Sequence, residues 1–359
     1  MPARHNAAFT ALLAAALFGT TTPLAKILLG SLSPFMVAGL FYLGSGLGLA
    51  ACILIRRLRR SADERQNESR IQLGELPWLL GAIVAGGVAG PALLMFGLSS
   101  APAATSALLL NLEGVFTAAI AWVVFKENVD LPIFVGMVAI LAGGVVLSWQ
   151  PGPVGYAGHA GISAGVLLVA GACAAWAVDN NLTRKVSTND AMVIACLKGL
   201  VAGSVNLAIA LLLGAHLPGP AKIAAAMLIG LAGYGVSLVL FVVALRNLGT
   251  ARTGAYFSAA PIFGVLLSLI LWPALPAPLF WLAAMLMAFG IWLHIRERHA
   301  HPHTHEVLDH NHRHRHDEHH QHKHDFEWDG QEPHVHPHRH LPITHTHAHF
   351  PDIHHRHQH

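Results

Sequence analysis

Long apolar runs alternate with short polar connections along the first 298 residues of the chain. A helix needs roughly 18 to 23 apolar residues to cross about 30 Å of hydrocarbon, and runs of this length recur ten times. Because the runs are continuous rather than alternating, and because a backbone in lipid must satisfy its own hydrogen bonds, they predict helices rather than the strands of a barrel. The predicted spans are residues 7–29, 34–55, 77–99, 103–125, 131–149, 161–182, 191–213, 223–245, 253–272 and 277–295.

The composition agrees with an all-α integral membrane protein. Hydrophobic residues make up 54% of the chain and charged residues only 11%, which is a membrane profile. The three cysteines all lie inside apolar runs, so neither a disulfide framework nor a cysteine-based zinc site is predicted. The first run also fits a cleavable signal peptide, with Arg4 before a short apolar core and Ala14–Ala16 after it. The repeat described below favours its retention.

Positive charge is concentrated in the even-numbered connections. Arg56, Arg57, Arg59, Arg60, Arg65 and Arg70 lie in the second, Lys126 in the fourth, Arg184 and Lys185 in the sixth, and Arg246 and Arg252 around the eighth. The odd connections hold almost no basic residue except Lys222. Because Lys and Arg are retained on the cytoplasmic side, both termini are predicted to be cytoplasmic in a bacterial-type inner (plasma) membrane.

The chain repeats itself at a spacing of about 146 to 158 residues, which is the kind of periodicity to look for before assigning a fold. LPIFVGMVAILAGGVVL at 131–147 aligns with APLFWLAAMLMAFGIWL at 277–293, and LLNLEGVF at 109–116 aligns with YFSAAPIF at 256–263. FGTTTPLAK at 18–26 aligns with WAVDNNLTR at 176–184. In the second helix of each half, Gly44 and Gly48 correspond to Gly199 and Gly203.

Each repeat contains five predicted crossings. Because five is odd, the second repeat must enter the membrane from the opposite face, and the two repeats are predicted to be inverted. The predicted domains are residues 1–149 and 150–298 for the two repeats, and 299–359 for a C-terminal tail. Inverted repeats support alternating access to a solute between the halves. A duplicated helical scaffold without transport is the alternative.

These segments resemble the EamA family of the drug/metabolite transporter superfamily. NLEGVF, SAAPIF, the acidic Glu127 that closes the fourth crossing and the five-plus-five layout carry the resemblance, which covers residues 7–295. It implies secondary transport of a small solute through a cavity between the halves, often as export. Where family members commonly have proline after the glutamate of the fourth helix, this chain has Gly114. The second half keeps Pro261 but has Ala260 in place of the acid.

Charged residues inside the apolar runs are candidates for the solute site, since a charge near mid-bilayer costs about 2.5 to 3.5 kcal/mol on insertion scales. Glu113 lies near the middle of the fourth run, Lys198 lies in the seventh and Asp179 lies near the end of the sixth. For Glu113 a solute or proton site and a structural hydrogen bond are both open. A Glu113–Lys198 pair is conceivable, but the long stem of Lys198 also allows it to reach the interface.

Neutral polar residues extend the candidate site. Thr20, Thr21, Thr22 and Pro23 interrupt the first helix, and Asp179, Asn180 and Asn181 occupy the equivalent positions in the sixth. Proline frees a backbone carbonyl, so we interpret the two patches as gates, with the threonines in the outer half and residues 179–181 in the inner half. A helix-end cap is the alternative for residues 179–181. Asn111, its partner Ser258 and nearby Tyr256 complete the predicted substrate-binding set.

No lysine follows a glycine, so the GK step of a phosphate-binding loop is missing and the chain is not expected to use ATP. An ion or proton gradient, or simple facilitation, remains. No enzymatic activity and no required cofactor are predicted. The expected partners are a small molecule or ion and the lipid bilayer, not nucleic acid, and a homodimer is compatible with the pattern.

The C-terminal tail is rich in histidine. All but four of the 27 histidines lie from His299 onward, and the few apolar residues predict a disordered segment. Imidazoles in His-X-His order favour Ni²⁺, Zn²⁺, Co²⁺ or Cu²⁺ over Mg²⁺ or Ca²⁺. The predicted metal ligands are His301, His303, His305, His310, His312, His314, His316, His319, His320, His322 and His324.

Three roles for the tail are open. It captures a divalent ion that the body exports, it senses metal or pH and regulates transport of another solute, or it is a passive appendage. A sensor without transport is a further alternative for the whole chain. The HEVLDH segment at 305–310 places Asp309 where HExxH needs its second histidine, which excludes a metalloprotease site there.

Overall fold

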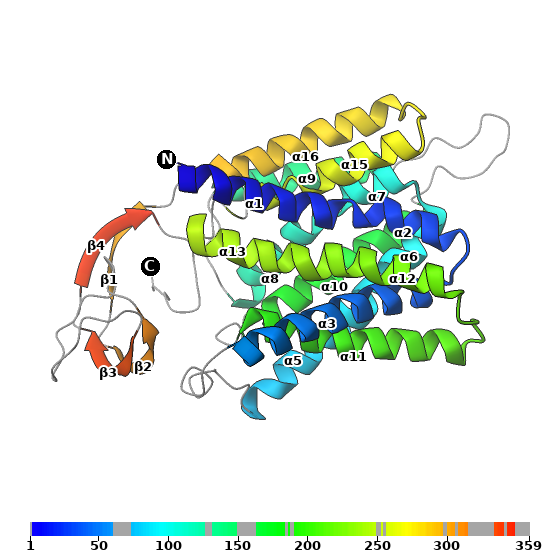
Figure 1. The fold of residues 1–359 in the computed structure, drawn as a ribbon. Coiled ribbons are helices and arrows are strands. Elements are labelled where there is room, and N and C mark those ends of the chain that lie inside the picture. The colour runs from blue at the N-terminus through cyan, green and yellow to red at the C-terminus, as the bar shows by residue number, and fades with distance from the viewer. Residues whose placement is uncertain are drawn as a thin grey trace. The chain divides into compact units, whose positions relative to one another are not determined.

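The structure is a computed structural model (Figure 1). It describes residues 2–59, 73–125, 131–148, 163–183, 186, 190–248, 253, 256–296, 300–305, 308–314, 334–340 and 343–348. Residues 1–297 and 298–359 are two separate units, and each is considered by itself. The described residues of the first unit are all-helical, as the apolar pattern predicts.

The first half of the helical unit consists of α1 (Pro2–Gly19), α2 (Thr21–Leu29), α3 (Pro34–Arg59), the short 3₁₀ turn η1 (Leu73–Glu75), α5 (Leu76–Ala82), the π-helical segment η2 (Ile83–Ala89), α6 (Gly90–Ser100), α7 (Ala103–Leu109), α8 (Leu112–Phe125) and α9 (Leu131–Ser148). The second half consists of α10 (Ala164–Thr183), α11 (Ala191–Leu212), α12 (Pro220–Gly230), the π-helical segment η4 (Leu231–Val236), α13 (Ser237–Leu248), α15 (Ala260–Leu271) and α16 (Pro278–Arg296).

Eight helical stretches among the described residues are long and apolar enough to cross a membrane. Two shorter apolar helices, Ala260–Leu271 and Pro278–Leu293, coincide with the last two predicted spans. The chain is therefore a multi-pass helical membrane protein, and the total of ten crossings stays a prediction.

Equivalent helices of the two halves pack against each other in antiparallel fashion. Along α3, Gly39 lies against Leu207 and Gly46 against Gly199, so α3 and α11 run in opposite directions. Along α9, Gly143 lies against Ala283, while Gly290 of α16 lies against Gly136. Small residues allow this close backbone approach in membrane proteins.

Helix breaks occur at equivalent places. α7 ends at Leu109 and α8 begins at Leu112, with Leu110 and Asn111 in a turn, and a matching turn at 258–259 precedes α15. The first span also breaks between α1 and α2, at Thr20. The π-helical segments η2 and η4 both lie in the third span of their repeat. These irregular positions place backbone groups where side chains can reach them.

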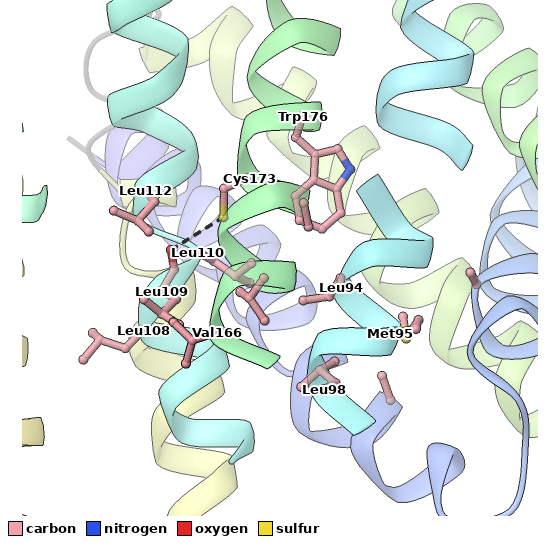
Figure 2. Packing of buried hydrophobic residues seen from close by; sticks show 14 of the residues in the cluster. Leu94, Met95, Leu98, Leu108, Leu109, Leu110, Leu112, Val166, Cys173 and Trp176 are labelled. Carbon is pink, nitrogen blue, oxygen red and sulfur yellow. Dashed lines mark hydrogen bonds between the residues drawn. The ribbon is translucent and has the colours of Figure 1, made fainter. Parts of the chain in front are cut away.

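The core of the helical unit joins both halves of the chain (Figure 2). In Figure 2, α10 lies between Leu94, Met95 and Leu98 of α6 on one side and the buried leucines of residues 108–112 on the other. The thiol of Cys173 donates to the carbonyl of Leu109 at 3.6 Å, close to the break between α7 and α8. The buried core thus fixes α10 next to that break.

The C-terminal unit forms two antiparallel two-stranded ladders. β1 (Ala300–His305) pairs with β4 (Ile343–Ala348), and β2 (Leu308–His314) pairs with β3 (His334–His340). These ladders differ from the disorder that the composition predicts. The predicted ligands His316, His319, His320, His322 and His324 lie outside the described residues, as does Glu127.

Candidate functional site

Asp179 and Lys198 form an ion pair between α10 and α11. The ammonium Nζ of Lys198 donates to both carboxylate oxygens of Asp179 at 2.6 Å. The hydroxyl of Thr183, one turn further along α10, donates to Oδ1 of Asp179 at 2.8 Å. Both charged side chains are largely enclosed, with 17% of Lys198 and 8% of Asp179 exposed. A charge pair this enclosed must compensate its own desolvation.

The carboxylate of Asp179 rests on the π-helical segment η2. A β-carbon added at Gly86 would overlap the Asp179 carboxylate. The carbonyl of Gly86 accepts hydrogen bonds from the hydroxyl of Tyr42 at 2.8 Å and from Nε1 of Trp176 at 2.9 Å. A π-helical segment shifts the usual backbone pairing, and here side chains from α3 and α10 bond its carbonyl. The carbonyl of Gly86 thus joins η2 to α3 and to α10.

The amide of Asn206 extends this arrangement by one residue. Its Nδ2 donates to the carbonyl of Gly87 at 3.0 Å and to the carbonyl of Ala202 at 2.9 Å. Asn206 is fully buried on α11. Two successive carbonyls of η2 are therefore held by side chains from other helices, which ties η2 to both α10 and α11.

Glu113 of α8 contacts α10 through Asn180, the residue that follows Asp179. Nδ2 of Asn180 donates to Oε1 of Glu113 at 2.9 Å and contacts the hydroxyl oxygen of Thr117 at 3.3 Å. Asn181 donates to the carbonyl of Thr117 at 3.3 Å. Glu113 is half-buried in the first turn of α8, directly after the helix break. Two adjacent residues of α10 thus lie next to acidic chemistry: Asp179 is paired with Lys198 of α11, and Asn180 donates to Glu113 of α8.

The conceivable Glu113–Lys198 pair is not formed. Lys198 pairs with Asp179 instead, because α10 and α11 bring these two side chains together. Among the described residues, no Lys or Arg forms an ion pair with Glu113. The cluster therefore contains two carboxylates and one ammonium group, and its formal charge is negative when both acids are ionised.

Aromatic side chains continue from this cluster toward α1. The rings of Tyr42 and Tyr234 are 5.3 Å apart, and the ring of Phe18 lies 5.9 Å from Tyr234 and 5.5 Å from Phe257. These rings come from α1, α3, η4 and the residues before α15. An aromatic lining next to a few polar groups is typical of small-molecule sites.

The hydroxyl groups of Thr20 and Thr21 form hydrogen bonds with their own helix. The hydroxyl of Thr20 donates to the carbonyl of Ala16 at 2.8 Å, and that of Thr21 donates to the carbonyl of Phe18 at 2.6 Å. Thr21 and Thr22 are buried. These hydrogen bonds satisfy backbone carbonyls of α1 at the break between α1 and α2.

The remaining predicted residues lie at the breaks of the fourth and ninth spans. Nδ2 of Asn111 donates to the carbonyl of Leu108 at 2.9 Å and lies 3.9 Å from the sulfur of Met287. Ser258 is half-buried and Tyr256 is exposed. The hydrogen bonds of Asn111 thus lie within its own helix break and toward α16, and not at the Asp179–Lys198 pair.

Sequence reasoning missed several residues of the cluster. Thr117 and Thr183 each follow a singled-out acid by four residues, which is the spacing of neighbours on one helix face. Trp176 stands in the quoted repeat segment, and Asn206 is a polar residue within the seventh apolar run. Tyr42 and Gly86 had no such signal, because their roles depend on the π-helical segment.

Lys26 and Arg56 have structural contacts. Nζ of Lys26 donates to the carbonyl of Leu98 and to that of Ala101 at the end of α6. Arg56 pairs with Asp190 at 2.5 Å, and Asp190 caps α11 by accepting from the backbone of Met192. Within the part of the chain whose side chains are described, no group of three or more His, Cys, Asp or Glu could hold a metal ion. The described cysteines are free.

Comparison with known proteins identifies the family. The model of the EamA-like transporter family matches residues 5–149 and 163–296. An uncharacterized transporter of Methanothermobacter thermautotrophicus is 28% identical over 263 residues, which cover 71% of this chain and 76% of that protein. A crystal structure with 20% identity has the same fold, with a TM-score of 0.56 over 80% of this chain and 96% of the other. This chain belongs to the EamA-like transporter family and is a multi-pass membrane transporter.

Proposed function

We propose that this protein is a secondary-active or facilitative transporter that exports a small solute by alternating access. The observation that carries the proposal is the cluster of Glu113, Asp179 and Lys198, in which Glu113 lies next to the α7–α8 break and Asp179 lies against the π-helical segment η2. Charges inside an apolar bundle are costly, and they are retained where they act on a solute or ion.

The antiparallel contacts support two inverted repeats of five helices. If the repeats are inverted, their near-equality provides two packings of similar energy, one open to each side of the membrane. The matching turns at 110–111 and 258–259 support the same reading, because broken helices place backbone groups near the middle of a transporter. Residues 1–149 and 150–298 are the proposed repeats.

In this proposal Glu113 is the group that binds the coupling proton or the solute. Asp179 already has its countercharge in Lys198, whereas the side-chain partner of Glu113 is the neutral amide of Asn180. A carboxylate without a cation is the member of the cluster that gains most from a proton or a positively charged solute. Asn180 and Asn181 then line the inner gate, and Thr20–Thr22 line the outer gate.

The His-rich tail is proposed to be a cytosolic segment that binds a divalent metal ion and accompanies the transporter. The absence of a metal-binding cluster among the described side chains of the helical unit favours a solute other than a metal. Imidazole must be neutral to bind, so metal binding by the tail weakens as pH falls toward about 6.5.

Everted membrane vesicles test the transport proposal. Vesicles from cells that express the protein are given a panel of radiolabelled amino acids, organic cations and Ni²⁺, with and without an imposed proton gradient. We expect uptake of at least one organic solute that depends on the protein. Glu113→Gln, which preserves the size of the side chain, is expected to reduce that uptake at least tenfold.

The matched control is Glu75→Gln, which changes an acid outside the cluster at the start of α5. It should leave uptake unchanged. Normal uptake by Glu113→Gln would remove Glu113 from the mechanism. Uptake of Ni²⁺ alone would replace the proposed function by metal export, and no uptake of any compound would favour a sensor.

A further inference from the structure

The π-helical segment η2 is followed directly by a proline. Gly90 and Pro91 begin α6 within one continuous apolar span from Leu73 to Ser100, and Pro91 is buried. Proline has no backbone N–H, so it cannot donate to a carbonyl of the preceding turn. The carbonyls that lie one turn before Pro91 therefore depend on other donors.

Gly90 and Pro91 together leave two carbonyls of η2 without their usual donors. In an α-helix the N–H of position 91 would donate to the carbonyl of Gly87, and in a continued π-helix it would donate to that of Gly86. The N–H of Gly90, which is the α-helical donor for Gly86, donates to the carbonyl of Ala85 instead. The carbonyl of Gly86 thus lacks both regular donors, and that of Gly87 lacks its α-helical donor.

Side chains from three other helices donate to these two carbonyls. Nε1 of Trp176 on α10 and the hydroxyl of Tyr42 on α3 both donate to the carbonyl of Gly86. Nδ2 of Asn206 on α11 donates to the carbonyl of Gly87. Because a buried carbonyl without a donor costs free energy, these hydrogen bonds anchor α3, α10 and α11 on η2.

The anchor on α10 lies next to the acid of the ion pair. Trp176 precedes Asp179 by three residues, so the two side chains are neighbours on one face of α10. Both of them meet Gly86: Trp176 donates to its carbonyl, and a β-carbon added there would overlap the carboxylate of Asp179. The bond from Trp176 to η2 therefore sets the position of Asp179.

The anchor on α11 lies on the same side of its helix as the cation. Lys198, Ala202 and Asn206 follow one another at intervals of four residues, which makes each a neighbour of the next on the helix surface. A β-carbon added at Gly87 would overlap the methyl group of Ala202, and Asn206 donates to the carbonyl of the same glycine. Contact with η2 therefore also sets the position of Lys198.

The second repeat has a π-helical segment without this proline. The N–H of Ser237, directly after η4, donates to the carbonyl of Ala232, as the N–H of Gly90 donates directly after η2. At the spacing of the repeat, Pro91 corresponds to Leu238, which has an N–H. A proline is thus not needed for π-helical pairing, and it occurs in the segment that contacts the ion pair.

We propose that Pro91 is a positioning residue for the Asp179–Lys198 pair. It withholds a backbone donor from η2, so that the free carbonyls anchor α10 and α11 with the ion pair between them. An N–H at position 91 competes with the side-chain donors and shifts η2 toward regular α-helical pairing, which displaces α10. This inference rests on the proposed role of the pair in solute transport and adds the residue that holds the pair in place.

Pro91→Ala tests this role, because alanine supplies the missing N–H without adding volume. Uptake of the radiolabelled amino acids and organic cations by everted vesicles should fall at least fivefold. The thermal unfolding midpoint in detergent should not fall, since the new N–H replaces the side-chain donors. A proline with only a structural role would instead leave uptake unchanged when the midpoint is unchanged.

The matched control is Pro220→Ala. Pro220 begins α12, where a backbone N–H has no acceptor within the helix. This variant should take up solute as the parent does. Equal losses of uptake in Pro91→Ala and Pro220→Ala would mean that removal of any proline disturbs the bundle, and would overturn the specific role of Pro91.

The indole of Trp176 reports the anchoring directly. In the full chain with isotope-labelled tryptophan, the Nε1–H resonance that disappears in Trp176→Phe should move upfield in Pro91→Ala, because its acceptor is taken by the new N–H. An unmoved resonance, or a moved resonance with normal uptake, would overturn the positioning role. A parent that takes up no compound would contradict the proposed function instead, and the resonance would still decide whether Pro91 controls the anchoring of α10.

Discussion

Two equivalent places in the helical unit differ in charge. The repeat alignment matches Thr21 of α2 with Asp179 of α10, and both side chains press on a glycine of a π-helical segment. A β-carbon at Gly233 would overlap the methyl group of Thr21, just as one at Gly86 would overlap the carboxylate of Asp179. The same packing is thus made once with a neutral side chain and once with a charged one.

The position of Lys198, the partner of Asp179, also differs in charge between the two repeats. Because Gly44 corresponds to Gly199, Leu43 corresponds to Lys198, and the first repeat has no charge at either position. The geometry of the fold therefore does not need an ion pair at this place. The ion pair is therefore specific to the second repeat, and the proposed role in transport accounts for it.

The largest effect is expected from Asp179→Thr, which copies the equivalent residue of the first repeat. It leaves Lys198 enclosed without its anion, and breaking one side of a buried pair costs about 3 to 5 kcal/mol. Thermal unfolding in detergent micelles should show a large drop in the midpoint. A midpoint within the error of the parent would mean that Lys198 finds another partner.

The double change Asp179→Thr with Lys198→Leu sharpens the comparison. It converts both positions to the residues of the first repeat and leaves no unpaired charge, so most of the lost stability should return. Solute uptake into vesicles should stay low. Recovery of both stability and uptake would show that the pair is only structural.

Gly86→Ala and Gly233→Ala compare the two packings directly. Both add a methyl group to a filled space, and overpacking of this kind costs about 1 to 3 kcal/mol. We expect Gly86→Ala to lower the unfolding midpoint more, because Asp179 is fixed by Lys198 and Thr183. Equal shifts would indicate that the ion pair does not hold Asp179 in place.

The sequence predicted the helical unit well because its signal is strong. Apolar runs of membrane length are unambiguous, and the described helices overlap all ten of them. Glu113, Asp179 and Lys198 could be proposed as site residues for the same reason, since any charge within an apolar run stands out. Their pairing was not predictable, because depth along a helix does not tell which face of the helix carries the side chain.

Other features depend on local geometry without a residue signature. Tyr42 and Asn206 donate hydrogen bonds to carbonyls of the π-helical segment η2, at Gly86 and Gly87. No sequence motif in η2 predicts that it is π-helical. The strands of the tail were missed because its composition is typical of disorder, although its alternation has the period of a strand. Composition indicates how much apolar area a segment can bury, but it does not show which residues of two strands are paired.

The smallest effect is expected from Trp176→Phe, which copies Phe18, the equivalent residue of the first repeat. The change removes the Nε1 donor to the carbonyl of Gly86, but the hydroxyl of Tyr42 still donates to that oxygen. One hydrogen bond contributes about 0.5 to 1.5 kcal/mol, so the unfolding midpoint should fall only slightly.

Adding Tyr42→Phe removes the second side-chain donor to the same oxygen. The carbonyl of Gly86 then has neither donor, and a buried acceptor left unsatisfied costs more than the loss of one of two bonds. The double variant should therefore lose more stability than the two single variants together, as measured by a double-mutant cycle of unfolding midpoints. Simple additivity would mean that another group satisfies this carbonyl.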